Sequence, residues 1–191
     1  MKVVAFSGSA RKDGNTAILV RHVFAELEKE GIETELVQLA GERLRGCIAC
    51  YQCWQTKDGS CAVKDDCIND CIQKMRAADG ILLASPVYYG DVTAQLKGFV
   101  DRTFCYLKPD YPTNPQPSRL APKKLVFVIA QGHPDEALFA DIFPRYQMFL
   151  QWMGFADCHL IRACGIGPAR VDAVPEPSLR QAEELARTLV A

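Results

Sequence analysis

The sequence predicts an α/β protein with a doubly wound sheet of five parallel strands and helices on both of its faces. Apolar segments rich in valine, isoleucine and leucine alternate with amphipathic segments along the 191 residues. The apolar segments are apolar almost throughout, which is typical of strands that helices cover on both sides. A regular alternation of strands and helices favours a parallel sheet.

The strands are predicted where short apolar runs stand between turn residues. They cover residues 3–8, 33–39, 80–90, 123–132 and 156–167. In a sheet of this kind, ligands bind beyond the carboxyl ends of the strands, at the point where the winding reverses. The loops that follow these runs are therefore the first places to look for a site.

Helices are predicted between the strands and after the last one, at residues 15–31, 65–79, 93–107, 137–154 and 178–190. The first has apolar residues at helical spacing and is expected to stop at Gly31. The second is expected to carry Asp65 and Asp66 in its first turn, where the helix dipole favours acidic side chains. Pro144 is expected to kink the fourth helix.

Length and composition indicate a single domain over residues 1–191. Hydrophobic residues make up 49% of the chain, which is enough to bury one core. Two segments interrupt the alternation of strands and helices. They are a cysteine-rich loop over residues 46–67 and a proline-rich loop over residues 109–122, whose five prolines exclude a helix or a central strand.

The charge balance argues against partners that need a strong net field. Lysine and arginine number 22 against 23 aspartates and glutamates, so neither nucleic acid nor a membrane surface is an expected partner. The amino-terminal apolar stretch is too short for a signal peptide, and no run reaches membrane-spanning length, so we expect a cytoplasmic protein. In that reducing compartment, nine cysteines favour metal binding or redox chemistry over disulfides.

The loop after the first strand has the residues of a phosphate site. It reads "SGSARKDGNT" and leads into a helix, whose free N–H groups and positive dipole end attract anions. Ser9 and Thr16 add hydroxyl groups, Asn15 adds an amide, and Arg11 adds a guanidinium. The loop matches neither a Walker motif nor GxGxxG, so a monophosphate is predicted. A capped helix after a glycine turn would explain fewer of these residues.

The loop after the third strand is predicted to form a second wall of the same site. Its residues are Pro86, Val87, Tyr88, Tyr89 and Gly90. A rigid backbone edge beside aromatic rings could hold a planar heterocycle. The alternative is a strand end at which the two tyrosines pack against the sheet.

These two loops, "GSARKDGNT" and "SPVYYGDVTAQLKGFVDR", resemble those of the flavodoxin-like NAD(P)H-dependent FMN reductase superfamily. The resemblance implies a flavodoxin-like fold with FMN as cofactor, its phosphate on the first loop and its ring on the second. It further implies that Gln131, Gly132 and His133 close the other edge of the ring, and that the protein is a homodimer or homotetramer. A proton-donor role for His133 competes with its being an ordinary surface histidine.

The cysteine-rich loop contains Cys47, Cys50, Cys53 and Cys61 with the spacing C-x2-C-x2-C-x7-C. This run resembles that of the iron–sulfur flavoproteins of the same superfamily, which implies a 4Fe–4S cluster. Three thiolates spaced three residues apart can reach three irons, and a fourth can close the cubane.

Other interpretations of the cysteines stay open. Four thiolates could bind zinc, Cys50 and Cys53 could form a bare dithiol, or the loop could hold no metal. Cys67 or Cys71 could replace Cys61 as fourth ligand. The remaining cysteines are expected to be small buried hydrophobic residues, namely Cys105, Cys158 and Cys164.

The resulting functional hypothesis is an FMN-dependent oxidoreductase in which the cluster passes electrons to or from the flavin. NAD(P)H or ferredoxin would be the donor, and a small molecule such as a quinone the acceptor. A cluster-free NAD(P)H-dependent FMN or quinone reductase is one alternative. A flavodoxin-like electron carrier is another, although near-neutral charge fits poorly with carriers that dock through strong surface fields.

Overall fold

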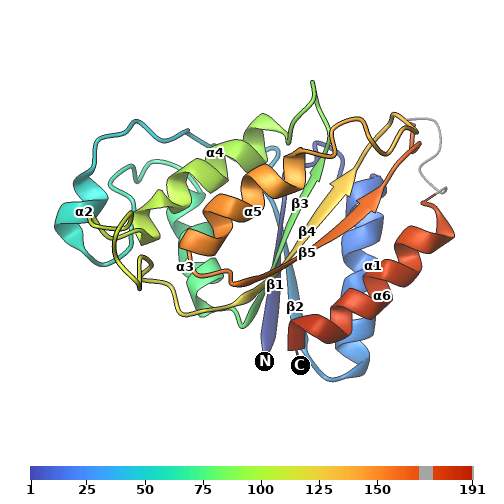
Figure 1. Cartoon of the computed structure of the whole chain (residues 1–191), viewed down its shortest axis with the longest axis horizontal. Coiled ribbons are helices and arrows are strands. Elements are labelled where there is room, and N and C mark those ends of the chain that lie inside the picture. Colours follow the sequence, from blue (N-terminus) through green and yellow to red (C-terminus); the bar gives the residue numbers. More distant parts are fainter. Residues whose placement is uncertain (168–173, 191) are drawn as a thin grey trace.

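The five predicted strands form one parallel sheet in the computed structural model, which describes residues 1–167 and 174–190 (Figure 1). The strand order is β2-β1-β3-β4-β5. The strands are β1 (Lys2–Ser7), β2 (Glu33–Gln38), β3 (Gly80–Pro86), β4 (Lys124–Ala130) and β5 (Asp157–Ala163). The chain moves from β1 to one edge and then returns to build the other, so the winding reverses between β1 and β3. The predicted flavodoxin-like, doubly wound topology is confirmed.

Helices cover both faces of the sheet (Figure 1). On one face lie α1 (Asn15–Lys29) and α6 (Glu176–Val190), and on the other lie α3 (Ile68–Ala77), α4 (Ala94–Arg102) and α5 (Ile142–Trp152). Alternate residues of one strand enter the two cores: Val3 and Ala5 pack under α1, whereas Val4 and Phe6 pack on the opposite side. Burial on both faces explains why these strands are continuously apolar.

Several predicted boundaries were wrong. Helix α3 begins at Ile68, so Asp65 and Asp66 precede its first turn instead of lying in it. Both carboxylates pair with arginines, and the Asp66 carboxylate also accepts a hydrogen bond from the Ile68 N–H. Helix α5 begins at Ile142, which places Pro144 in the first turn and not at a kink. Proline is tolerated there because an N–H in the first turn has no intrahelical partner.

Other segments also differ from the expected spans. Strand β3 ends at Pro86, and the residues that follow form a turn. The helix predicted over 93–107 divides into α4 and a 3₁₀ helix, η1 (Thr103–Tyr106). The cysteine-rich segment contains a short helix, α2 (Gln52–Thr56). Residues 168–173 and 191 of the predicted single domain lie outside the described residues.

The proline-rich segment, residues 109–122, begins with turns and continues as an irregular loop, in which Ser118 forms an isolated antiparallel bridge with Leu107. Within the described part of the chain, we find no helix with the length and apolar character needed to cross a bilayer.

Candidate functional site

The predicted phosphate loop, residues 8–14 and called the phosphate loop below, connects the end of β1 to the start of α1. Its Ser9 hydroxyl donates to the carbonyl of Arg11 at 3.1 Å and accepts from the Arg11 N–H at 3.2 Å, which closes a tight turn. The Arg11 side chain lies against Gly14, since a Cβ built on that glycine would stand 3.2 Å from the Arg11 Nε. A guanidinium therefore lies beside the amino terminus of α1.

The backbone N–H groups at the amino terminus of α1 are available to an anion. Gly14 is the N-cap, and no side chain of the described residues caps the helix. Asn15 and Thr16 are buried, and the Asn15 Oδ1 has no hydrogen-bond partner among residues 1–167 and 174–190. Buried side-chain amides are normally satisfied, so this oxygen would need a hydrogen-bond donor from a bound molecule. The loop thus combines free N–H groups, a guanidinium and a buried amide.

The ring loop, residues 86–91, follows β3. Tyr88 and Asp91 exchange backbone hydrogen bonds of 2.8 and 3.2 Å, and the two residues between them have positive φ, +52° at Tyr89 and +82° at Gly90. This is the geometry of a type I′ turn, in which a bulky residue at the first position is uncommon. Tyr89 is fully exposed and Tyr88 is half exposed. The tyrosines therefore project from the sheet edge and do not pack against it.

Thr93 joins the two loops. Its hydroxyl donates to the Gly8 carbonyl at 2.9 Å and accepts from the Leu96 N–H, so it caps α4 at the same time. Its own N–H donates to the Ser85 hydroxyl. The contact is close because Gly8 has no side chain: a Cβ there would stand 2.3 Å from the Thr93 Oγ1. This residue was not predicted from the sequence, although a threonine directly before a helix is a capping signal.

Gln131 and His133 follow β4, and the structure gives both of them local partners. The Gln131 amide donates to the carbonyls of His133 and Asp135, at 2.8 and 2.7 Å, and its Oε1 accepts from Arg162. Gln131 is buried, and with these bonds its side chain holds the loop in shape. His133 is exposed, and its Nδ1 accepts from the Asp135 N–H. A Cβ built on Gly132 would have one neighbour within 4 Å, the Ile166 carbonyl oxygen at 3.9 Å, so the space there is open.

The four cysteines of the predicted ligand run line one small cavity. Cys47 and Cys50 are exposed, whereas Cys53 and Cys61 are buried. Burial, and then the neighbouring thiols of Cys61, Cys50 and Cys47, raise the pKa of Cys53. Across residues 1–167 and 174–190, no three His, Cys, Asp or Glu side chains are already arranged to hold a metal ion. The structure thus brings the four thiols to one place without fixing a coordination geometry.

The other cysteines occupy different positions. Cys67 does not line this cavity; it precedes α3, and its carbonyl accepts a hydrogen bond from the Cys71 N–H at 3.2 Å. Cys105 does line the cavity, but its thiol donates to the Gly59 carbonyl at 3.1 Å. Burial raises the pKa of Cys105 to about 12. Its thiol therefore stays protonated and acts as a packed hydrogen-bond donor.

The backbone around Cys50 has an uncommon conformation. Ala49 and Tyr51, on either side of it, have φ of +51° and +54°. A left-handed conformation costs a residue with a side chain roughly 1–2 kcal/mol. Such residues cluster at sites that clamp a ligand, because the surrounding structure must hold them there.

Arg102, at the end of α4, is a buried cation beside the cysteine cavity. Its guanidinium pairs with Asp66, and its Nε donates to the Cys61 Sγ at 2.9 Å. Neither charged side chain of the pair is exposed. Burial alone would raise the pKa of Asp66, but hydrogen bonds from Arg102 and from backbone N–H groups outweigh it and lower the pKa. Sequence analysis did not identify Arg102, since an arginine in a helix is usually exposed.

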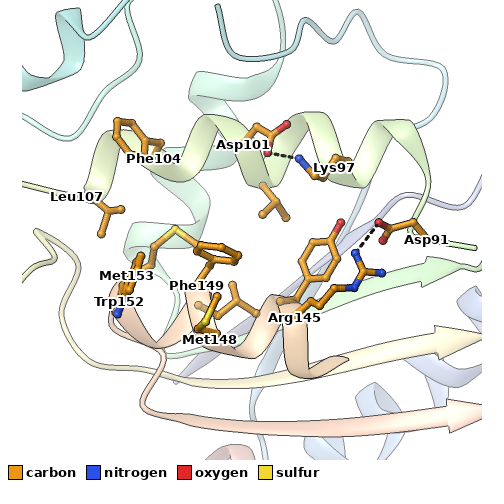
Figure 2. Close-up of a pocket in the computed structure, with 13 residues that line it drawn as sticks. Asp91, Lys97, Asp101, Phe104, Leu107, Arg145, Met148, Phe149, Trp152 and Met153 are labelled. Carbon is orange, nitrogen blue, oxygen red and sulfur yellow. Dashed lines mark hydrogen bonds and ion pairs between the residues drawn. The ribbon is translucent and has the colours of Figure 1, made fainter. Parts of the chain in front are cut away.

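A groove of about 550 Å³ runs between α4 and α5 (Figure 2). At one end, Asp91 of the ring loop pairs with Arg145 at 3.2 Å. At the other end lies Phe104, which also lines the cysteine cavity. The groove therefore extends from the ring loop to the cysteine-rich segment. Its α5 wall is apolar and half exposed, and includes Phe149 and Trp152.

Comparisons with known proteins find relatives of the same kind as the sequence motifs indicate. Residues 1–142 match the model of the NADPH-dependent FMN reductase family. An iron–sulfur flavoprotein from Methanocaldococcus jannaschii is 48% identical over 103 residues, which cover 54% of this chain and 52% of that protein. One from Archaeoglobus fulgidus is 38% identical over 106 residues, or 56% and 47%. The chain thus spans about half the length of the curated relatives it matches.

Solved structures share the fold at low sequence identity. An NAD(P)H:quinone oxidoreductase from Methanothermobacter marburgensis has a TM-score of 0.77 at 19% identity, over 100% of this chain and 98% of that one. An FMN-dependent NADH-azoreductase from Bacillus anthracis, solved in complex with FMN, has a TM-score of 0.71 at 13% identity, over 100% and 99%.

Proposed function

The chain belongs to the NADPH-dependent FMN reductase family, and from this premise we propose that it is an FMN-dependent oxidoreductase whose flavin exchanges electrons with an iron–sulfur cluster. The observation that carries the flavin assignment is the uncapped start of α1, where the Arg11 side chain lies against Gly14. Helix amino termini of this kind bind phosphate groups. FMN would supply the exchange of one or two electrons.

The chain's own residues would bind and orient the cofactor. Ser9, Arg11, Asn15 and Thr16 hold the phosphate, with Arg11 as the charged donor. Residues 86–90 lie against the ring, at the point where the order of the strands reverses. Because the Gln131 side chain is already bonded within its loop, that loop would approach the ring through the backbone near Gly132. His133 remains a candidate proton donor at this edge.

Replacing Arg11 tests the phosphate assignment. Arg11→Ala should weaken FMN binding by roughly 1.5–3 kcal/mol, because a charge-assisted hydrogen bond is lost. Riboflavin lacks the phosphate and should bind equally well to both proteins. Fluorescence titration of the flavin-free protein measures both ligands, and Arg180→Ala on α6 is the matched control for charge. An equal loss for FMN and riboflavin would contradict the assignment.

We propose that Cys47, Cys50, Cys53 and Cys61 hold a 4Fe–4S cluster. The shared cavity of the four thiols and the left-handed backbone around Cys50 support this assignment, as do relatives named iron–sulfur flavoproteins. The position of Cys67 away from the cavity favours Cys61 as the fourth ligand. Two other interpretations of this segment compete with the cluster: a bound zinc ion, or cysteines that hold no metal and form a bare dithiol.

Metal content decides among these occupants. Anaerobic reconstitution should give close to four irons and four sulfides per chain, with FMN bound as well. Cys50→Ser should abolish iron uptake and keep FMN binding, since the flavin loops follow β1 and β3. Cys67→Ser is the matched control and should keep its iron. Zinc in place of iron, or full iron in the Cys50 variant, would overturn the assignment.

The electron donor is proposed to be NAD(P)H or ferredoxin, and the acceptor a small molecule such as a quinone. Steady-state turnover with NADH, NADPH and a quinone tests this directly. Turnover by a protein without iron would favour a cluster-free NAD(P)H-dependent FMN or quinone reductase. Reduction and reoxidation without turnover of any small molecule would favour an electron carrier.

We also propose that the groove between α4 and α5 joins two copies of this chain. Exposed apolar side chains of α5, namely Met148, Phe149 and Trp152, line the groove. An exposed apolar surface of this kind can pack against its own copy across a two-fold axis. Aromatic residues and methionine are typical of such interfaces, and the charges along the groove are paired within the chain.

Sedimentation velocity tests this interface. Phe149→Glu should shift the protein toward the monomer, because it places a charge in an apolar contact. Gln151→Glu adds the same charge on an exposed position of α5 outside the groove and should leave the assembly unchanged. A monomeric wild-type protein would refute the proposal.

A further inference from the structure

Every N–H group of the buried Arg102 guanidinium has a hydrogen-bond partner. Nη1 donates to the Arg45 carbonyl at 2.9 Å and to the Asp66 Oδ2 at 2.8 Å. Nη2 donates to the Val63 carbonyl at 2.8 Å and to the Asp66 Oδ1 at 3.3 Å. The remaining donor, Nε, reaches the Cys61 Sγ at 2.9 Å. Five donors in a fixed planar fork leave the group a single orientation.

These contacts fix the position of one cysteine in particular. Arg102 binds the segment at residues 45, 61, 63 and 66, so it holds both ends of the cysteine-rich loop against α4. Of the four thiols of the cavity, Cys61 is the one that receives the guanidinium N–H. Among the described residues, by comparison, Cys47 accepts from a backbone N–H alone, that of Ala49, at 3.4 Å.

We propose that Arg102 is a positioning residue that selects Cys61 as the fourth ligand of the cluster and raises the reduction potential of that cluster. This inference rests on the cluster proposed above. Hydrogen bonds to ligand sulfurs tune the potential of iron–sulfur sites, and outer-shell partners orient metal ligands. A hydrogen bond from a cation to a ligand sulfur stabilises the reduced form of the cluster, which is the more negative one. The reduction potential of the cluster therefore rises.

The same helix connects this residue to the flavin loops. Helix α4 starts after Thr93, which is hydrogen-bonded to the phosphate loop, and ends at Arg102. Its nine residues span about 14 Å at 1.5 Å per residue. One rigid element therefore holds the phosphate loop at its amino end and Cys61 at its carboxyl end.

The test removes the hydrogen bond without leaving a buried charge alone. Arg102→Met alone would leave Asp66 as a buried carboxylate without a partner. The substitution is therefore combined with Asp66→Asn. The double variant is reconstituted anaerobically and titrated electrochemically, with EPR detection of the reduced cluster. We expect lower iron occupancy and a lower midpoint potential, with FMN content unchanged. A tenfold change in the one-electron equilibrium would appear as a shift of about 59 mV.

Two further variants separate positioning from folding. Arg102→Lys keeps the charge opposite Asp66 but loses the guanidinium fork, and should lower the potential in the same direction. Arg76→Met is the matched control, because Arg76 donates to the Asp58 carbonyl of the same segment but to no cysteine in the part of the chain that the structure describes. An unchanged potential in both Arg102 variants, with full iron, would overturn the role of Arg102. Wild-type protein that binds no iron would instead overturn the cluster itself.

Discussion

The contact between Gly8 and Thr93 makes a sharp prediction for Gly8→Ala. An alanine Cβ would stand 2.3 Å from the Thr93 Oγ1 and 2.7 Å from the Leu96 Cβ, so the start of α4 must move. Losing the hydroxyl bond to the Gly8 carbonyl costs about 1 kcal/mol, and losing the helix cap about 1 kcal/mol more. Overpacking against the buried Leu96 adds roughly 1–3 kcal/mol. These contributions give an expected total destabilisation of about 3–5 kcal/mol.

Urea unfolding of the flavin-free protein, followed by circular dichroism, measures this loss. The transition midpoint should fall by about 1–2 M with an unchanged slope. Gly46→Ala is the matched control, since a Cβ there meets nothing within 4 Å, and it should stay within about 0.5 kcal/mol of wild type.

A double variant tests the cause. In Gly8→Ala combined with Thr93→Ala, the nearest clashing atom is gone, so the combined loss should be smaller than the sum of the two single losses. Strict additivity, or a Gly8→Ala protein as stable as the Gly46 control, would refute the reasoning.

Two further predictions concern the stability of the sheet and of its covering helices. Tyr106→Phe removes the hydroxyl that donates to the carbonyl of Ile72, and should lower the free energy of unfolding, measured in urea, by about 1–2 kcal/mol. Hydrogen bonds from Lys2 and then Lys74 lower the pKa of Glu35 below 4.5, so its contribution to stability is complete above that pH and is lost as the pH falls further. The stability difference between wild type and Glu35→Gln should therefore shrink below about pH 4.5 in a urea series, and a difference that grows there would contradict this sign.

Much of the architecture followed from the sequence because local patterns determine it. Continuous apolar runs indicated strands buried on both faces, and all five lie in the sheet. Element ends were harder to predict, since they depend on contacts outside the element. The sequence pattern placed Asp66 in the first turn of a helix. In the structure its carboxylate binds Arg102, 36 residues away, and α3 starts only after Asp66.

For the candidate site, the sequence by itself determined which loops would meet. Parallel strands end at one edge, so the loops after β1 and β3 had to lie side by side, and the order of the cysteines put four thiols in one short segment. Only the tertiary structure decided what holds these parts in place. Thr93 contacts Gly8, and Arg102 reaches Cys61, because α4 packs between two segments that are distant in the chain. Such contacts depend on how helices pack on the sheet, and no local pattern of residues encodes that packing.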